Sequence, residues 1–234
     1  MDSIPMSLSK ELAGVRAVIC DVYGTLLQVG PPPENAEELW QERCSALGIP
    51  RGSLPEFNAK CDARIATENA RSRRGGEPYP EQDWMEIVLD EWPELHDLGV
   101  GAFVELSRLH ARCCRTCRAL PGALQTLQAA RNAGLLLGIA SNAQTYTISE
   151  LRAAGIPFGD FDRKLIFLSG AHGFAKPSPR VFALLTERLA ALDIEPWETL
   201  MVGDSLENDI APAAAAGWRT WHIGPRTWSE MFVE

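Results

Sequence analysis

One aspartate at the end of an apolar run is the residue of this chain best suited to covalent chemistry. Asp21 follows the apolar residues 17–20, begins the segment Asp21-Val22-Tyr23-Gly24-Thr25 and precedes Leu26-Leu27. The pattern predicts a buried strand that delivers a carboxylate to its C-terminal end, beside a glycine turn and a hydroxyl, where a nucleophile is well placed. The alternative interpretation is an aspartate whose side chain only caps a turn.

Three further segments carry polar side chains in a related setting. They are Ile139-Ala140-Ser141-Asn142, then Lys176-Pro177-Ser178-Pro179, then Val202-Gly203-Asp204-Ser205 with Asp209 beyond it. In this order, and together with the first segment, they resemble motifs I to IV of the haloacid dehalogenase (HAD) superfamily. The resemblance spans most of the chain, from Ala17 to about Ile223. Each motif is short, but four of them in the right order and spacing are specific.

The resemblance implies a role for each of these side chains. In the superfamily the first aspartate attacks the substrate and becomes a covalent ester or acyl phosphate, which here is Asp21. Lys176 is expected to neutralise the nucleophile and the charge on the transferring group. Ser141 and Asn142 are expected to bind a phosphoryl oxygen, although they can also cap the helix that follows. Thr25 is expected to donate a hydrogen bond to the nucleophile or to a substrate oxygen.

The fourth segment adds carboxylates and predicts a metal site. Two unit charges about 4 Å apart repel by roughly 4 kcal/mol at an effective dielectric constant of about 20. Mg²⁺ prefers oxygen ligands and would offset this repulsion. The expected ligands are Asp21, the backbone carbonyl of Tyr23, and Asp204. Asp209 is expected to be an additional or water-mediated ligand, or else to orient Lys176.

Tyr23 departs from the common phosphatase pattern, which has a second aspartate at this position as general acid and base. A tyrosine has an ordinary pKa of about 10 and is a poor base at neutral pH, and loss of a positioned acid/base typically costs about 10²–10⁴ in rate. The sequence Asp-x-Tyr-Gly-Thr is typical of 2-haloacid dehalogenases, which displace halide without a proton or a metal. Asp204 and Leu206 argue the other way, because dehalogenases usually carry an uncharged residue and then an Asn at these positions.

The expected activity is therefore that of a magnesium-dependent phosphatase, a hydrolase acting on a small phosphorylated metabolite. A 2-haloacid dehalogenase and a low-activity regulatory or binding protein are the alternatives. Phosphonate cleavage is a further alternative. Members of the superfamily with that activity lack the second aspartate and use a lysine of an inserted cap domain to form a Schiff base. Lys60 is the one lysine between residues 30 and 119. Arg71-Ser72-Arg73-Arg74 could collect an anionic substrate, or could simply be an exposed loop.

The elements that position these residues are predicted from five short apolar runs, which lack the alternation of half-exposed strands. The runs are 17–20, 135–140, 165–168, 200–202 and 220–223, and helical patterns are found at 123–132, 145–154, 179–191 and 207–216. Strands that alternate with helices predict a doubly wound α/β sheet, a Rossmann-like core. Its site is expected at the carboxyl ends of the strands.

The region from about Pro31 to Ala119 does not fit this alternation. Helical patterns at 36–47, 56–69, 81–92 and 101–117, with a polar loop at 71–80, predict an all-helical insertion. In the resembled superfamily such an insertion is a C1-type cap domain that closes over the crevice, excludes water and selects the substrate. We expect a core domain of residues 1–29 and 120–234 and a helical cap domain of residues 30–119.

Composition and charge exclude several other functions. The net charge of −9 argues against non-specific binding to nucleic acid, which needs a basic face. No apolar stretch approaches the ~20 residues of a membrane span, and the first ten residues lack a secretory signal. The expected partner is a small phosphorylated molecule, with no nucleic acid and no membrane, and the expected state is a cytoplasmic monomer or homodimer.

The six cysteines are expected to be reduced thiols. Cys113, Cys114 and Cys117 lie close to His110 in the sequence and could form a zinc or redox site. Against this, the chain has no second C-x-x-C pair, and the stretch has a helical pattern.

Overall fold

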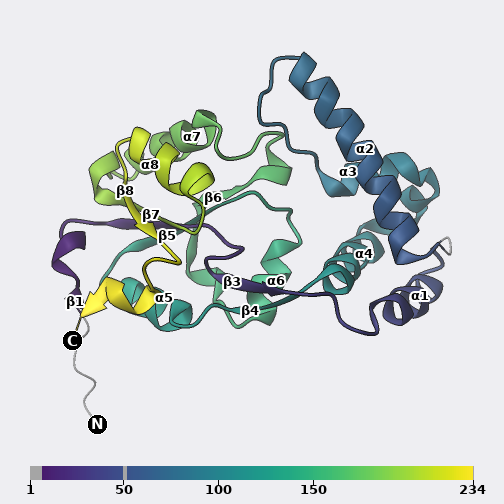
Figure 1. Ribbon diagram of the computed structural model, residues 1–234, viewed down its shortest axis with the longest axis horizontal. Helices are drawn as coiled ribbons and strands as arrows, with labels where there is room; N and C mark the ends of the chain where they lie inside the picture. The colour runs from purple at the N-terminus through teal and green to yellow at the C-terminus, as the bar shows by residue number, and fades with distance from the viewer. Residues whose placement is uncertain (1–6, 50–51, 234) are drawn as a thin grey trace, which may run out of the picture.

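A five-stranded parallel sheet forms the centre of the molecule. A computed structural model describes residues 7–49 and 52–233 of the chain. The strand order is β6-β5-β2-β7-β8 (Figure 1). The strands are β2 (Ala17–Cys20), β5 (Leu136–Ser141), β6 (Phe161–Leu168), β7 (Thr199–Gly203) and β8 (Arg219–His222). All five predicted strands are confirmed, and so is the α/β class.

Helices cover both faces of the sheet, as the doubly wound prediction requires. Figure 1 shows α7 (Pro179–Ala190) and α8 (Ala211–Ala215) on one side and α5 (Ala123–Asn132) and α6 (Thr147–Ala153) on the other. The predicted helix at 207–216 is only partly right. Residues Leu206–Ile210 form a π-helical turn ahead of α8, and this turn carries Asp209.

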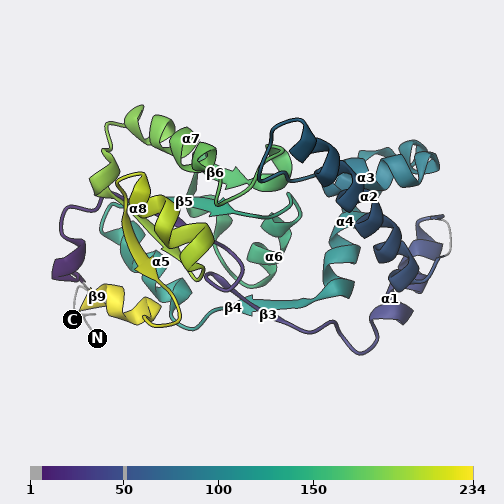
Figure 2. The same ribbon diagram turned by 45° about the horizontal axis from the view of Figure 1, so that its top comes forward.

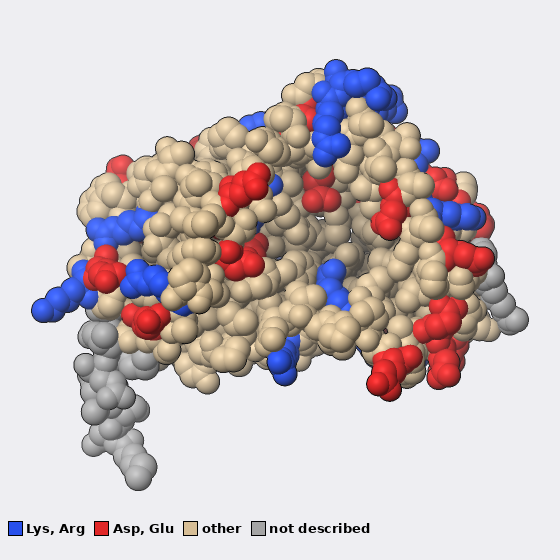
Figure 3. Space-filling model, viewed as in Figure 1, with Lys and Arg blue, Asp and Glu red and all other residues tan. Residues whose placement is uncertain are grey.

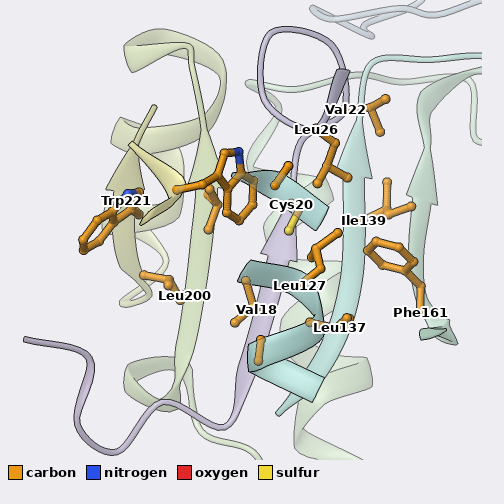
Figure 4. Packing of buried hydrophobic residues seen from close by; sticks show 14 of the residues in the cluster. Val18, Cys20, Val22, Leu26, Leu127, Leu137, Ile139, Phe161, Leu200 and Trp221 are labelled. Atoms are coloured by element: carbon orange, nitrogen blue, oxygen red, sulfur yellow. The ribbon is translucent and has the colours of Figure 1, made fainter. Parts of the chain in front are cut away.

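The central strand β2 is buried on both faces, which explains its uninterrupted apolar sequence. Val18 and Cys20 pack in one hydrophobic cluster with Leu127 of α5, whereas Ile19 packs in a second cluster with Phe182 of α7. Figure 4 shows the first of these clusters. Because successive residues of a strand point to opposite faces, every position here must be apolar. The sheet therefore holds Asp21, the next residue, on a rigid support.

The region inserted after the first strands is helical, as predicted. It contains α1 (Ala36–Ala46), α2 (Leu54–Arg74), α3 (Trp84–Glu91) and α4 (Gly99–Cys114), with a short 3₁₀ helix at Pro93–Leu98. We call these four helices and their connections the helical insertion. It has its own hydrophobic cluster, which includes Trp40, Phe57, Trp84 and Leu106.

Two boundaries within the helical insertion were predicted wrongly. The expected polar loop at 71–80 begins too early, because α2 continues to Arg74, and arginines in a last helical turn interact favourably with the helix dipole. The expected helix at 101–117 extends too far, because residues Thr116–Ala119 form a strand, β4. The arginines at 71–74 thus lie on the last turn of a helix and not in a loop.

Strand β4 pairs with β3 (Leu27–Gly30) in an antiparallel ribbon that the sequence patterns did not predict. The chain leaves the sheet through β3 and returns through β4, and Figures 1 and 2 show the two strands side by side between the sheet and the helical insertion.

The domain division at residues 29/30 and 119/120 remains a prediction, which the separate hydrophobic clusters support. Strands β1 (Ser7–Leu8) and β9 (Phe232–Val233) also pair. None of the described helices has the length and apolar character needed to cross a membrane.

Candidate active site

Three carboxylates meet at the carboxyl end of the sheet. Asp21 directly follows β2, Asp204 directly follows β7, and Asp209 lies in the π-helical turn that comes next. One carboxylate oxygen from each lies within 4.8 Å of the others. Parallel strands that end at one edge account for this convergence. Figure 3 shows that this face of the molecule is hollowed between the sheet and the helical insertion, with both acidic and basic side chains at the hollow.

Lys176 lies among these carboxylates and is 4% exposed. Its Nζ donates hydrogen bonds to Asp21 Oδ1 at 2.7 Å and to Asp209 Oδ1 at 2.5 Å. Burial alone would lower the pKa of Lys176, but the two carboxylates outweigh it and raise that pKa above its usual value. Lys176 is therefore a charged ammonium that touches the predicted nucleophile.

Asn142 holds the backbone of Lys176 in place. Its side-chain Nδ2 donates to the carbonyl of Lys176 at 2.8 Å, and its Oδ1 accepts from the N–H of Lys176 at 2.8 Å. A paired amide contact of this kind fixes one residue against another. The predicted substrate-binding residue Asn142, which directly follows β5, thus has a clear positioning contact with Lys176.

Asp209 is almost fully enclosed, at 1% exposed. Its Oδ1 accepts from Lys176, and its Oδ2 accepts from the N–H of Ser205 at 3.0 Å. Of the two roles predicted for Asp209, these contacts favour the orientation of Lys176. Burial raises the pKa of the Asp209 carboxyl, while the charge of Lys176 opposes that shift.

Asp204 differs from Asp209 because it is exposed. Its Oδ1 accepts a long hydrogen bond of 3.4 Å from the hydroxyl of Thr25. The pKa of the Asp204 carboxyl is raised, first by partial burial and then by the negative charge of Asp21. Among the described residues Asp204 forms no salt bridge, so its carboxylate lies near that of Asp21 without a paired cation.

The donor set fits a hard divalent cation. Among the described residues, Asp21, Asp204 and Asp209 are the one group of three His, Cys, Asp or Glu side chains close enough to hold an ion. Three carboxylates against one ammonium leave an excess of negative charge, and oxygen donors are those that Mg²⁺ prefers. Because Asp209 is engaged with Lys176 and Ser205, Asp21 and Asp204 are the side chains best placed as ligands.

Gly24 allows residues 21–26 after β2, which we call the catalytic loop, to pack directly against Asp204. It has φ +82°, and a Cβ atom there would lie 2.2 Å from Asp204 Oδ2. Any other residue would strain the backbone and displace the carboxylate. The position of Asp204 in the fourth motif therefore requires a glycine at position 24 in the first motif.

Of the residues predicted to bind a phosphoryl oxygen, Ser141 has a hydroxyl that is free to do so. Its hydroxyl is buried at the end of β5 and has no hydrogen-bond partner within the described structure. Buried hydroxyls are normally bonded, so an orphaned one at a site indicates a place for a missing oxygen or nitrogen atom. Thr25 is also buried, and its carbonyl accepts from the indole N–H of Trp228 at 2.8 Å, a support that the sequence patterns did not indicate.

The hydroxyl of Tyr23 bonds to residues outside the carboxylate cluster. Its hydroxyl contacts Thr147 Oγ1 at 2.7 Å and Arg115 Nη2 at 2.7 Å, and it donates a short hydrogen bond to the carboxylate of Glu150. Burial, and then the charge of Glu150, raise the pKa of Tyr23 above its usual value. Arg115 and Glu150 are not among the residues predicted from the sequence, because neither belongs to a motif and both lie far from Tyr23 along the chain.

One cavity is not lined by Asp21, Asp204 or Asp209. It has a volume of about 820 Å³ and lies between α1, α4 and α6, where Arg115, Tyr146 and Glu150 line it. A cavity of about 610 Å³ includes Gly24 and Asp204. We assign the chemistry to the point where the three carboxylates meet Lys176, which the second cavity adjoins at Asp204.

Other candidate residues are not brought to this site. Lys60 lies over the ring of Trp92 within the helical insertion, 5.5 Å from the ring centroid. Cys114 Sγ lies 3.3 Å from His110 Nε2, and Cys113 is buried nearby, but no metal-binding group of three forms there among the described residues. Burial raises the pKa of the Cys114 thiol, so it is not an activated thiolate.

Comparisons with known proteins agree with this geometry. A family model described as haloacid dehalogenase-like hydrolase matches residues 15–217. A phosphoglycolate phosphatase of Nitrosospira multiformis is 27% identical and covers 87% of this chain and 80% of its own length. The haloacid dehalogenase-like hydrolase domain-containing protein 3 of Bos taurus is 33% identical, over 90% of this chain and 83% of its own length.

Solved structures share the fold without distinguishing the reaction. A HAD phosphatase from Thermococcus onnurineus matches with a TM-score of 0.52 and 23% identity, over 91% of this chain and 89% of that one. An L-2-haloacid dehalogenase matches equally well, with a TM-score of 0.52 and 24% identity, over 90% of this chain and 86% of that one. The choice between the two reactions therefore depends on the side chains at the site.

Proposed function

Because the chain belongs to the haloacid dehalogenase-like hydrolases, we propose that it is a magnesium-dependent phosphatase acting on a small phosphorylated metabolite. The observation that carries this proposal is the pair formed by Asp21 and Asp204, two carboxylates within ligand distance of a common point. A second carboxylate beside the nucleophile is destabilising unless a cation lies between them. Phosphatase-named relatives support the same class of reaction.

The proposed reaction has two displacements at phosphorus. A carboxylate oxygen of Asp21 attacks phosphorus, the bond from phosphorus to the leaving oxygen breaks, and the leaving oxygen takes a proton from solvent. Water then attacks the phosphorus of the aspartyl phosphate and loses its proton, so that inorganic phosphate leaves and the Asp21 carboxylate is restored. Splitting one difficult displacement into two is the general advantage of a covalent intermediate.

The other residues hold charge and position. Lys176 presents an ammonium to Asp21 and to the oxygens of the transferring group, while Asp209 and Asn142 keep it there. The free hydroxyl of Ser141 donates to a phosphoryl oxygen, and Thr25 supports the loop that carries the nucleophile. Asp21, Asp204 and the carbonyl of Tyr23 would hold Mg²⁺, which would supply positive charge near the phosphoryl oxygens. The helical insertion acts as a C1-type cap that limits the access of bulk water while admitting the water that the second displacement needs.

Haloacid dehalogenation is the second candidate, and Tyr23 is the observation that favours it. Displacement of halide from carbon by Asp21 needs neither a proton nor a metal. Asp204 opposes it, because without a metal ion the single ammonium of Lys176 would have to offset three carboxylates. Release of chloride from 2-chloropropionate in metal-free buffer would support the dehalogenase.

The proposal is tested by turnover of p-nitrophenyl phosphate with Mg²⁺, with EDTA, and in Asp21→Asn. Activity is expected only in the wild type with Mg²⁺. Asp97→Asn is the matched control, because Asp97 is exposed in the helical insertion, away from the site, and this change should leave turnover unaltered. Turnover that persists after chelation, or in Asp21→Asn, would contradict the proposal. The relatives make 2-phosphoglycolate the first natural phosphate to assay.

A further inference from the structure

Tyr23 takes part in a four-residue network that no motif accounts for. The network consists of Tyr23, Arg115, Thr147 and Glu150, and we call it the hinge network. The hydroxyl of Tyr23 bonds to each of the other three side chains. Arg115 adds two hydrogen bonds to Glu150, from Nε at 2.9 Å and from Nη2 at 3.0 Å.

The members of this network come from different parts of the molecule. Arg115 lies between the last residue of α4 and the first residue of β4, where the helical insertion returns to the sheet. Thr147 and Glu150 lie on α6, which packs on the sheet. Tyr23 lies on the catalytic loop, two residues after Asp21. Arg115 thus ties the hinge, where the helical insertion returns to the sheet, both to Tyr23 of the catalytic loop and to Glu150 of α6.

The chemistry of the hinge network makes it sensitive to geometry. Glu150 is 9% exposed and Arg115 is 25% exposed, so both charges are largely removed from water. Paired guanidinium–carboxylate bonds require a fixed relative orientation, which a lysine cannot reproduce. The guanidinium also lies over the ring of Tyr23, with 4.5 Å between its carbon and the ring centroid. A shift of the hinge away from α6 would therefore leave buried charges without partners.

The helical insertion also contacts the sheet domain on its other side, next to Lys176. The carbonyl of Tyr79 accepts from the N–H of Ala175 at 2.9 Å. Gln144 of the core accepts from the N–H of Trp84 at 3.0 Å and donates to the carbonyl of Gln82 at 2.8 Å. With both sets of contacts made, the insertion is held against the core in the arrangement that we call docked.

We propose that Arg115 and Glu150 are positioning residues that fix Tyr23, and with it the catalytic loop, in register with the docked helical insertion. Tyr23 then serves as the core side of a hinge contact and transfers no proton to the leaving group. The proposal explains why a tyrosine can occupy the acid/base position of the catalytic loop: its hydroxyl is committed to three partners at the hinge. The kinetic part of the proposal rests on the proposed phosphatase function, whereas the structural part does not.

The structural part is tested by amide hydrogen exchange in the full-length protein. We expect Arg115→Lys and Glu150→Gln to speed exchange in peptides covering residues 114–120 and 147–154 by about tenfold, the factor for loss of one charge-assisted hydrogen bond. Peptides covering β5 and β7 should be unchanged. Arg118→Ala is the matched control, because Arg118 lies on β4 close to Arg115, is exposed, and its side chain bonds only to Gln28 among the described residues. Equal exchange in wild type, Arg115→Lys and Glu150→Gln would overturn the hinge network.

The kinetic part is tested by comparing a good and a poor leaving group, p-nitrophenyl phosphate and glycerol 2-phosphate. If Tyr23 only positions the loop, Tyr23→Phe, Arg115→Lys and Glu150→Gln should lower kcat/KM by a similar factor on both substrates. The double variant Tyr23→Phe/Arg115→Lys should be little worse than either single variant, because the residues act as a unit.

A proton-donating Tyr23 would give a different result. Tyr23→Phe would then slow glycerol 2-phosphate far more than p-nitrophenyl phosphate, because only the poor leaving group needs the proton. Arg115→Lys would not reproduce that split, and this pattern would overturn the positioning role. A wild-type protein without phosphatase activity would contradict the proposed function, and the exchange data would still decide the hinge network.

Discussion

Lys176 and Asp209 form an ion pair that is almost completely enclosed, with 2.5 Å between Nζ and Oδ1 and side chains that are 2% and 1% exposed. The second oxygen of Asp209 is bound by the N–H of Ser205. Asp209 is therefore bonded through both oxygens, and these contacts favour the predicted role of aiming the ammonium of Lys176 at Asp21. The hydrogen bonds thus distinguish Asp209 from Asp204, although the two aspartates look alike in the sequence.

We expect Asp209→Asn to lower kcat/KM by about 10–100-fold, because Lys176 loses the charge that holds it beside the nucleophile. The Mg²⁺ concentration for half-maximal activity should move by less than about twofold, because Asp209 is not a principal ligand. Titration of phosphatase activity with Mg²⁺ measures both effects. Asp204→Asn is the comparison, and it should raise the Mg²⁺ requirement by at least about tenfold. A large rise in Asp209→Asn would show that Asp209 is a direct ligand.

Removal of the metal should reveal the repulsion between Asp21 and Asp204. The pKa of Asp204 is raised in the folded state, so its stabilising contribution is present at low pH and is lost as pH rises through the folded pKa. In EDTA at pH 7, Asp204→Asn should therefore unfold at a higher temperature than the wild type. Excess Mg²⁺ should stabilise the wild type and leave the variant nearly unchanged. Thermal melts with and without Mg²⁺ provide the measurement, and a variant that is less stable in EDTA would refute the account.

The buried histidine of the helical insertion should make stability depend on acid pH. Burial lowers the pKa of His110 from 6.5 to about 4. A folded pKa below the unfolded one means that stability is intact above pH 6.5 and falls as the pH drops toward 4. The loss by pH 4 should reach about 2–3 kcal/mol. Urea unfolding at several pH values should show a flatter profile in His110→Gln, whereas the exposed His96→Gln should retain the wild-type slope.

Gly24→Ala should disable the site more than it destabilises the fold. The added methyl group would meet Asp204 at 2.2 Å, and the residue would have to keep φ +82°. Gly76→Ala is matched for backbone strain, because Gly76 has φ +99° but nothing within 4 Å of the added atom. Both variants should lose about 1–2 kcal/mol of stability. Only Gly24→Ala should lose Mg²⁺-dependent activity, and equal activity in the two variants would contradict the contact.

Sequence patterns within a short segment predicted the buried strand β2 and the start of helix α7. The apolar run 17–20 identifies a strand because both faces of β2 are covered, and Ser178-Pro179 identifies the start of α7 because a hydroxyl cap and a proline suit a first turn. The end of α4 could not be predicted in this way. Residues 116–119 form a strand because β3 offers a partner, and pairing over such a separation leaves no signal in either segment.

In the candidate site, too, residues within motifs were predicted, whereas partners that are distant in sequence were not. The order of the motifs was sufficient to place Asp21, Lys176 and Asp204 at one edge of the sheet. The partners of Tyr23 could not be found, because Arg115 and Glu150 resemble ordinary helical charges in sequence and acquire their role only through the hinge. The two roles open to Asp209 also needed coordinates, because only hydrogen-bond geometry distinguishes a metal ligand from an orienting group.

The most direct test of the proposed function is acid-quench mass spectrometry of the protein after brief mixing with a phosphate ester and Mg²⁺. The account predicts one added phosphoryl group on the peptide that contains Asp21. The added mass should be absent in Asp21→Asn and in EDTA. An unmodified Asp21 peptide during active turnover, or a phosphoryl group on another residue, would contradict the account.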